Sequence, residues 1–336
     1  MNESILNIWN NDEACYVVAE IGINHEGDTE KCAKLIKDCA EAGVDGIKLQ
    51  SVNPDLAYSK NSLSYQIFSQ ARLSPEQTQQ MFSYANKLGI EAFTTSGDPE
   101  TLEWVDRLEP PVHKISSGLL NCIPLLDKVC GMGRPIILSN GASDDDDITD
   151  AVKLIQTKGL RYAILQCTSE YPCPAENIGL GEIIKLKNKF ACPCGFSDHS
   201  VGYFFAPLAV ACGAKIIEKH VTFDRDRPSF DHHISLLPHE LKKMVDDIRL
   251  AEKAISIESK KLKRKKIEIS GKISRYLALR KPLSVGDTIS ADDLTYMRFS
   301  DGGGNILAKE YKNVIGRMLK VNMDKAKPLM WCHFYE

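Results

Sequence analysis

The sequence predicts an α/β protein in which a (βα)8 TIM barrel is followed by a small β-rich domain. First, short runs rich in β-branched residues alternate with helical patterns from residue 16 to about residue 257. Second, there are eight such runs, which favours closure into a barrel. Third, the pattern changes at about Ile273 to short β-like runs separated by turns. A chain of 336 residues is long enough for both domains.

The elements of the barrel have recognisable ends. Ser74-Pro75 is a typical helix start, and Gly43 and Gly89 are typical helix stops. The acidic run Asp144–Asp147 is interpreted as a capped first helical turn, because carboxylates there complement the helix dipole. The eight strands are expected to begin at Tyr16, Gly46, Glu91, Val112, Pro135, Tyr162, Cys194 and Ala214.

A long amphipathic helix from Pro238 to about Ile257 is expected to end the barrel. It is followed by the basic run Lys260–Lys266, which lacks the interleaved aromatic residues of a nucleic-acid site and is interpreted as a solvated linker. We therefore expect the barrel domain at residues 1–258, a linker at 259–272 and the β-rich domain at 273–336.

The composition argues against several functional classes. A net charge of -3 and a pI near 6.3 give no general attraction for nucleic acid or for an anionic membrane surface. The sequence has neither a signal-peptide pattern nor an apolar run of about 18 residues, so we expect a cytoplasmic protein without membrane segments. The 11 cysteines are scattered through predicted strands and helices, which favours reduced core thiols.

Polar side chains gather at the carboxyl ends of all eight predicted strands. Catalytic groups of TIM barrels come from this edge. One such residue alone is commonly a surface loop residue, but the whole set favours a functional site. Lys48 with Gln50, and Glu218 with His220, are two residues apart and would face the same side. The set comprises Glu20, Lys48, Gln50, Thr95, Lys114, Ser116, Ser117, Ser139, Thr168, Ser169, Ser197, His199, Glu218 and His220.

His199 and His220 follow consecutive predicted strands, so their imidazoles are expected to meet. A lone histidine on an apolar strand is usually a core group, but here both have acids nearby, namely Asp198, Glu218 and Asp231. Two neutral imidazoles suit a divalent transition ion and leave positions open for water and substrate oxygen. We expect Mn²⁺, with Mg²⁺ or Co²⁺ as alternatives.

Lys48 and Lys114 stand inside apolar strands, where an unpaired ammonium is costly to bury. A ligand that carries phosphate and carboxylate would resolve this cost, with hydroxyl groups at neighbouring strand ends as further donors. The competing hypothesis is a Schiff-base lysine, because a desolvated lysine at a barrel strand end can form an imine.

The strand-end motifs resemble those of the sialic acid synthase family. Its members condense phosphoenolpyruvate with an N-acylated hexose to give nine-carbon 2-keto acids (nonulosonates) and phosphate. The most specific matches are GFSDHSVG at Gly195 and EKHVTFDRDRPSFDHHISL at Glu218. The region from about Ile273 is similar to the antifreeze-like (SAF) domain of this family. Further matches are AEIGINHEG at Ala19, GIKLQ at Gly46, HKISSG at His113, PIILSNG at Pro135 and LQCTSEYPCP at Leu165.

The resemblance implies a C–C bond-forming transferase that cleaves the C–O bond of phosphoenolpyruvate. It implies that His199 and His220 hold the metal, and that Glu218, Lys48 and Lys114 are catalytic, with Glu218 a candidate for proton transfer. It also implies a domain-swapped homodimer in which Arg298 reaches the partner's barrel. The phosphoenolpyruvate site would comprise Lys48, Thr95, Lys114, Ser117, Ser139, Ser169 and Ser197, and the sugar site Glu20, Gln50, Tyr171, Asp231 and Arg298.

The chain departs from the family pattern at Leu119, where an acid is common, and at Asn140, where ILSTG reads ILSNG. Ser96-Gly97 also replaces the usual Pro-Phe. We therefore expect the acceptor to be N-acetylmannosamine or a modified analogue, such as a deoxy or diacetamido sugar, with Leu119 and Asn140 deciding between them. Two other hypotheses stay open: a class I aldolase that acts on pyruvate through a Schiff base, and a non-catalytic barrel that binds carbohydrate.

Overall fold

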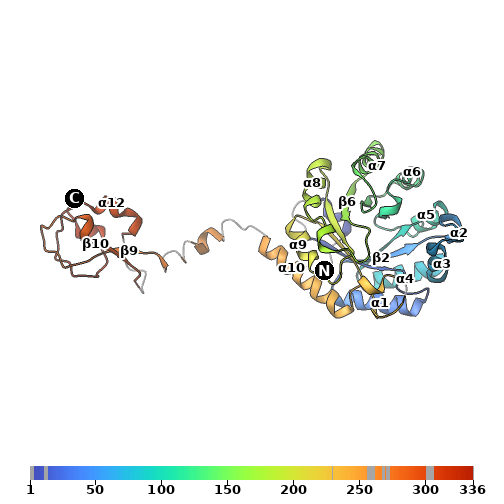
Figure 1. Cartoon of the computed structure of the whole chain (residues 1–336), viewed down its shortest axis with the longest axis horizontal. Coiled ribbons are helices and arrows are strands. Elements are labelled where there is room, and N and C mark those ends of the chain that lie inside the picture. Colours follow the sequence, from blue (N-terminus) through green and yellow to red (C-terminus); the bar gives the residue numbers. More distant parts are fainter. Residues whose placement is uncertain are drawn as a thin grey trace. The chain divides into compact units, whose positions relative to one another are not determined.

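A closed barrel of eight parallel strands forms the first part of the chain, as the computed structural model shows (Figure 1). The structure describes residues 4–10, 14–228, 230–255, 262–266, 269, 273–299 and 306–335. Each strand pairs with the next, and β1 also pairs with β8, which closes the ring. This confirms the predicted fold class. The strands are β1 (Tyr16–Gly22), β2 (Gly46–Ser51), β3 (Glu91–Ser96), β4 (His113–Ile115), β5 (Ile136–Ser139), β6 (Tyr162–Cys167), β7 (Cys194–Asp198) and β8 (Ile216–His220).

Helices surround the barrel (Figure 1), and their ends follow local chemistry. Ser74 and Gln77 form a capping box at the start of α4, and Asp144 and Asp147 form another at α7, which places these two acids in a helix cap. The helices are α1 (Thr29–Ala42), α2 (Pro54–Ala57), α3 (Leu63–Ala71), α4 (Pro75–Lys87), α5 (Pro99–Asp106), α6 (Ile123–Gly131), α7 (Asp145–Thr157), α8 (Gly181–Phe190), α9 (Phe205–Ala211) and α10 (Pro238–Ile255).

The amino-terminal end of the barrel is filled with apolar side chains. Tyr16, Phe93 and Leu165 belong to this buried cluster, and a 3₁₀ helix at Ile5–Trp9 packs Ile5 and Ile8 against it. The Glu91 carboxylate accepts hydrogen bonds from the Ile5 backbone and the Tyr16 hydroxyl, both at 2.8 Å. Because this end is filled, a polar site can form only toward the carboxyl ends of the strands.

The chain divides between Ile255 and Ser256 into two compact units, of which the second is described by itself. In it, β9 (Tyr276–Leu279) pairs antiparallel with β10 (Leu294–Met297), and a short helix, α12 (Tyr311–Val314), follows. Leu277, Leu319 and Leu329 belong to its buried core. Most of the predicted linker 259–272, including part of its basic run, lies outside the described residues.

Two further expectations concern the whole chain. All 11 cysteines are free thiols, and eight of them are buried, in accord with the predicted reduced core. Among the residues that the structure describes, no helix is both long and apolar enough to cross a membrane.

Candidate active site

Four charged side chains meet at the carboxyl end of the barrel: Glu20 of β1, Lys48 of β2, Lys114 of β4 and Glu218 of β8. None is more than 5% exposed. Lys48 Nζ lies 2.8 Å from Glu20 Oε2 and 3.5 Å from Glu218 Oε1. Lys114 Nζ lies 3.6 Å from Glu218 Oε1. We call these four residues the charged cluster.

The charged cluster corrects one step of the sequence reasoning. Lys48 and Lys114 were expected to lack a partner in the protein, yet each has a carboxylate within ion-pair distance. The reason is the closure of the barrel. Glu20 of β1 is the register partner of Lys48 in β2 on one side and of His220 in β8 on the other. Only β1 therefore separates β2 from β8, and side chains of these two strands can meet.

Neutral polar groups surround the charged cluster. Lys114 donates to the Ser139 hydroxyl at 2.7 Å, and Lys48 contacts the Thr95 hydroxyl at 3.4 Å. Ser197 donates to Glu218 Oε1 at 3.0 Å, and the Gln50 amide donates to Glu20 Oε1 at 2.9 Å. The structure therefore brings most of the predicted phosphoenolpyruvate residues, with Glu20 and Gln50 of the sugar set, into one buried network.

Burial and pairing act differently on the two carboxyl groups. Burial raises the pKa of Glu20 to about 7, although the Lys48 ammonium opposes this shift. Burial alone would also raise the pKa of Glu218, but Lys114 and Lys48 together hold that pKa below its ordinary value. Burial lowers the pKa of Lys114, and Glu218 only partly compensates. Glu218 therefore stays ionised where Glu20 titrates near neutral pH.

His199 and His220 lie side by side at the ends of β7 and β8, with ring centroids 5.6 Å apart. His199 Nδ1 donates to the Thr168 carbonyl at 2.8 Å, which turns Nε2 toward the Tyr171 hydroxyl at 3.1 Å. The Tyr171 ring stacks on His199 at 4.1 Å between centroids. His220 Nδ1 lies 3.7 Å from Asp231 Oδ2. The predicted metal ligands and two predicted sugar residues thus meet.

These two histidines fit a divalent ion. His220 Nδ1 is buried without a hydrogen-bond partner. Burial, and then the neighbouring His199, keep the pKa of His220 well below its usual range, so the ring is neutral, the form that binds metal. Within the described part of the chain, no group of three or more His, Cys, Asp or Glu side chains is arranged to hold a metal. An ion here would therefore have two protein ligands and open positions for water or substrate.

Two residues at the carboxyl ends of β5 and β6, Gly141 and Cys167, belong to the site but were not predicted from the sequence. A Cβ atom at Gly141 would lie 2.7 Å from Ser169 Oγ and 2.9 Å from both Cys167 Sγ and Ser117 Oγ, so a larger residue here would force these side chains to move. Cys167 Sγ also lies 3.7 Å from His199 Nδ1. Cys167 ends β6, so its place at a strand end could have marked it as a site residue, but the sequence pattern favoured a reduced core thiol.

Some predicted site residues lie outside the buried network around the charged cluster. Ser169 is exposed, and Tyr171 is 44% exposed beside the histidines. Arg298 is exposed on the second unit, so its predicted reach into a partner's barrel stays a prediction.

Asn140 joins β5 to β6, because its side chain accepts from the Cys167 backbone at 2.9 Å and donates to Gln166 Oε1 at 3.2 Å.

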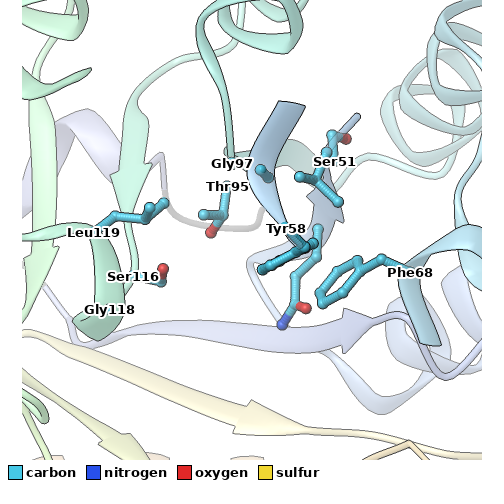
Figure 2. Close-up of a pocket in the computed structure, with 11 residues that line it drawn as sticks. Ser51, Tyr58, Phe68, Thr95, Gly97, Ser116, Gly118 and Leu119 are labelled. Carbon is cyan, nitrogen blue, oxygen red and sulfur yellow. The ribbon is translucent and has the colours of Figure 1, made fainter. Parts of the chain in front are cut away.

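A pocket of about 260 Å³ opens next to the charged cluster, beside β2, β3 and β4 (Figure 2). Gln50 and Thr95 line it together with Leu119 and Gly97, two of the positions that depart from the family pattern. Gly97 is needed for packing, because a Cβ atom there would lie 2.6 Å from Val52 Cγ2. Asn140 is not one of the residues that line the pocket.

The fold and the site are those of a TIM-barrel enzyme, because the buried ionisable groups gather at the carboxyl ends of the strands. The model of the NeuB family matches residues 35–260, and that of the SAF domain matches residues 274–334. The chain belongs to the NeuB family, as the resemblance in the sequence predicts.

Similar proteins make different sugar acids. The chain is 32% identical to the N,N'-diacetyllegionaminic acid synthase of Legionella pneumophila over 95% of its own length and 94% of the relative's. It is 31% identical to the N-acetylneuraminate-9-phosphate synthase of Mus musculus, over 84% and 82% of the two chains. The solved sialic acid synthetase of Leptospira borgpetersenii has a TM-score of 0.74 at 30% identity, covering 78% of this chain and 93% of that one.

Proposed function

We propose that this protein condenses phosphoenolpyruvate with an N-acetylated amino sugar to give a nine-carbon 2-keto acid and phosphate. The observation that carries the proposal is the charged cluster of Glu20, Lys48, Lys114 and Glu218 beside the two adjacent histidines. The similarity to synthases of legionaminic acid and of N-acetylneuraminate 9-phosphate supports the same reaction class.

The lysines of the charged cluster would hold the phosphate and carboxylate of phosphoenolpyruvate. Because burial raises the pKa of Glu20, this carboxyl group compensates the charge of the lysines only partly near neutral pH. The surplus positive charge attracts an anion, and burial strengthens that attraction. Lys114 has its nearest carboxylate oxygen 3.6 Å away, against 2.8 Å for Lys48, so it gains more from an anionic ligand.

The reaction forms a C–C bond between the two substrates and a C–O bond to water, and it breaks the C–O bond to the phosphate group. C3 of phosphoenolpyruvate attacks the aldehyde carbon of the open-chain sugar, and the aldehyde oxygen takes up a proton. Water then adds to C2 and loses a proton, which leaves a hydroxyl group on C2. The bond from C2 to the bridging oxygen then breaks, phosphate leaves with that oxygen, and the hydroxyl group loses its proton to give the 2-keto group. A divalent ion held by His199 and His220 would polarise the aldehyde oxygen as a Lewis acid.

Of the two carboxyl groups, Glu20 is better suited to proton transfer than Glu218. A general acid or base is most effective when its pKa lies near the working pH, and the pKa of Glu20 is about 7. Glu218 is held ionised by two lysines and would instead keep their ammonium groups in position. This alters the role that the resemblance implies for Glu218, while it keeps that residue in the site.

Phosphate release tests the proposal directly. Phosphoenolpyruvate labelled with ¹⁸O in the bridging oxygen, with Mn²⁺ and an amino sugar, is expected to yield labelled phosphate, and a chelator is expected to stop the reaction. Lys114→Met should abolish turnover, whereas Lys153→Met, at an exposed lysine of α7, should leave it unchanged. Borohydride trapping of a pyruvate adduct, without any use of phosphoenolpyruvate, would establish the aldolase instead. Sugar binding without turnover would establish the non-catalytic barrel.

The domain-swapped homodimer is tested by mixing two inactive variants, Arg298→Ala and Lys114→Met. If Arg298 acts on the partner's barrel, heterodimers contain one intact site, and the 1:1 mixture recovers about a quarter of the wild-type activity. If Arg298 acts within its own chain, mixing recovers nothing.

A further inference from the structure

One buried side chain, that of Asn24, joins the turn after β1 to the segment between β8 and α10. Asn24 is fully buried. Its amide N–H groups donate to the Val221 carbonyl at 2.8 Å and to the Ser235 hydroxyl at 2.9 Å. Its side-chain oxygen accepts from the Asp231 backbone N–H at 3.2 Å. The single amide of Asn24 therefore holds this segment at its start, in its middle and near its end.

Both backbone groups of Asp231 are held by these contacts. Asn24 accepts from its N–H, and the Ser235 hydroxyl donates to its carbonyl oxygen at 2.6 Å. Ser235 is buried and is itself held by Asn24. Because the peptide groups on both sides of its Cα atom are fixed, the direction of the Asp231 Cα–Cβ bond is fixed as well. We call Asn24 and Ser235 the clamp.

The Asp231 carboxylate depends on the clamp for its position. Its Oδ2 lies 3.7 Å from His220 Nδ1, which is beyond hydrogen-bond distance. Among the residues that the structure describes, no group donates a hydrogen bond to this carboxylate. The side chain is 27% exposed, so a ligand can reach it. Its place beside His220 is therefore set by its backbone.

A second set of contacts keeps other parts of the same segment in place. Glu26 stands two residues after Asn24 in the turn after β1. Its carboxylate accepts from Arg227 Nη2 at 2.7 Å and lies 3.3 Å from Nε2 of the fully buried His232. Loss of the Asn24 amide would therefore displace Asp231 without releasing the whole segment.

We propose that Asn24 is a positioning residue of the reaction: with Ser235 it fixes the Asp231 carboxylate at the place where that group meets the acceptor sugar. The inference rests on the proposed function, in which Asp231 contacts the sugar. Asn24 acts only through Asp231, because a fully buried side chain cannot reach a ligand itself. A displacement of about 1 Å at a reacting group can cost about 100-fold in rate, so a change in the clamp reaches the chemistry.

Steady-state phosphate release tests this role, with phosphoenolpyruvate and either N-acetylmannosamine or 2,4-diacetamido-2,4,6-trideoxymannose as the acceptor. Asn24→Ala should lower kcat/KM for the acceptor by about 10- to 100-fold, in part through a higher acceptor KM. The KM for phosphoenolpyruvate should stay within about twofold of wild type. Ser235→Ala removes one hydroxyl group and should give the same pattern with a smaller loss. Asn86→Ala, at an exposed asparagine of α4, should change neither KM.

A purely structural role of Asn24 predicts a different pattern. A smaller folded fraction lowers kcat and leaves both KM values unchanged. In a protein that already carries Asp231→Asn, adding Asn24→Ala should cost no more than about a further twofold in kcat/KM, because the group that Asn24 positions has already been altered. Hydrogen exchange should rise in peptides that contain Asp231 and stay unchanged in β4 and β5.

The outcomes separate this inference from the proposed function. If Asn24→Ala lowers kcat alone, raises both KM values together or multiplies with Asp231→Asn, the inference is wrong and the proposed function stands. Exchange that rises throughout the barrel would also overturn it. If Asn24→Ala does not fold, Ser235→Ala decides by the same KM comparison. If the wild-type protein releases no phosphate with either sugar, the proposed function fails and the inference fails with it.

Discussion

A buried ion pair behind the two histidines leads to the strongest prediction about stability. Asp198 precedes His199 in the chain, and Lys219 precedes His220. Asp198 and Lys219 are register partners in the neighbouring strands β7 and β8. Lys219 Nζ lies 3.3 Å from Asp198 Oδ2, and both side chains are fully buried. Lys219 also donates to the Ser200 carbonyl at 2.5 Å. The pair therefore joins the strand ends that position both imidazoles.

Lys219→Met would leave the Asp198 carboxylate buried without its ammonium partner. At 3.3 Å and an effective dielectric constant of about 20, the attraction lost is about 5 kcal/mol. Removing one partner of a buried pair costs about 3–5 kcal/mol of unfolding free energy. For a unit of this size we expect the melting temperature to fall by about 10 °C.

Urea unfolding of Lys219→Met, Asp198→Asn and the double variant measures this effect as a double-mutant cycle. The double variant should be less destabilised than the sum of the single variants, because no uncompensated charge remains. Lys153→Met, which removes an exposed ion pair with Asp150, should change stability by less than about 1 kcal/mol. A Lys219→Met protein within about 1 kcal/mol of wild type, or strictly additive variants, would refute the reasoning.

Three further predictions follow from other contacts. Gly141→Ala should destabilise the barrel by about 1–3 kcal/mol in thermal unfolding, because its Cβ atom overlaps three site atoms; an unchanged midpoint would argue against that packing. The double variant His199→Ala, His220→Ala should lose Mn²⁺ binding in an electron paramagnetic resonance titration, and retained affinity would place the metal elsewhere. Hydrogen bonds from Ser290 lower the pKa of Asp293 to about 2, so its contribution to stability is present above about pH 4 and is lost as the pH falls to about 2. Hydrogen exchange in the second unit should therefore be faster in Asp293→Asn than in wild type at pH 6, and a difference that persists at pH 2 would contradict this.

The location of the site followed from the sequence because it depends on local pattern. Strand periodicity marks where each strand ends, and parallel strands of a barrel present those ends on one face. His199, His220, Lys48 and Lys114 could thus be singled out without knowing which strands are neighbours. The same rule missed Cys167, because a cysteine in an apolar run was assigned to the core.

Contacts between distant parts of the chain were decided only by the tertiary structure. The pairing of Lys48 with Glu20 and Glu218 depends on β1 lying against both β2 and β8. Leu119 and Asn140 were equivalent in the sequence, yet Leu119 lines a pocket whereas Asn140 ties two strands together.

By itself the sequence determined the barrel, the second domain, the family and the face on which the ionisable groups gather, because periodicity and strand-end residues are local properties. The tertiary structure decided which carboxylate compensates which lysine, which carboxyl group titrates near neutral pH, and which departure from the family pattern faces a pocket. Those properties depend on burial and on distances of a few ångströms between residues far apart in the chain, which become defined only when β8 closes against β1.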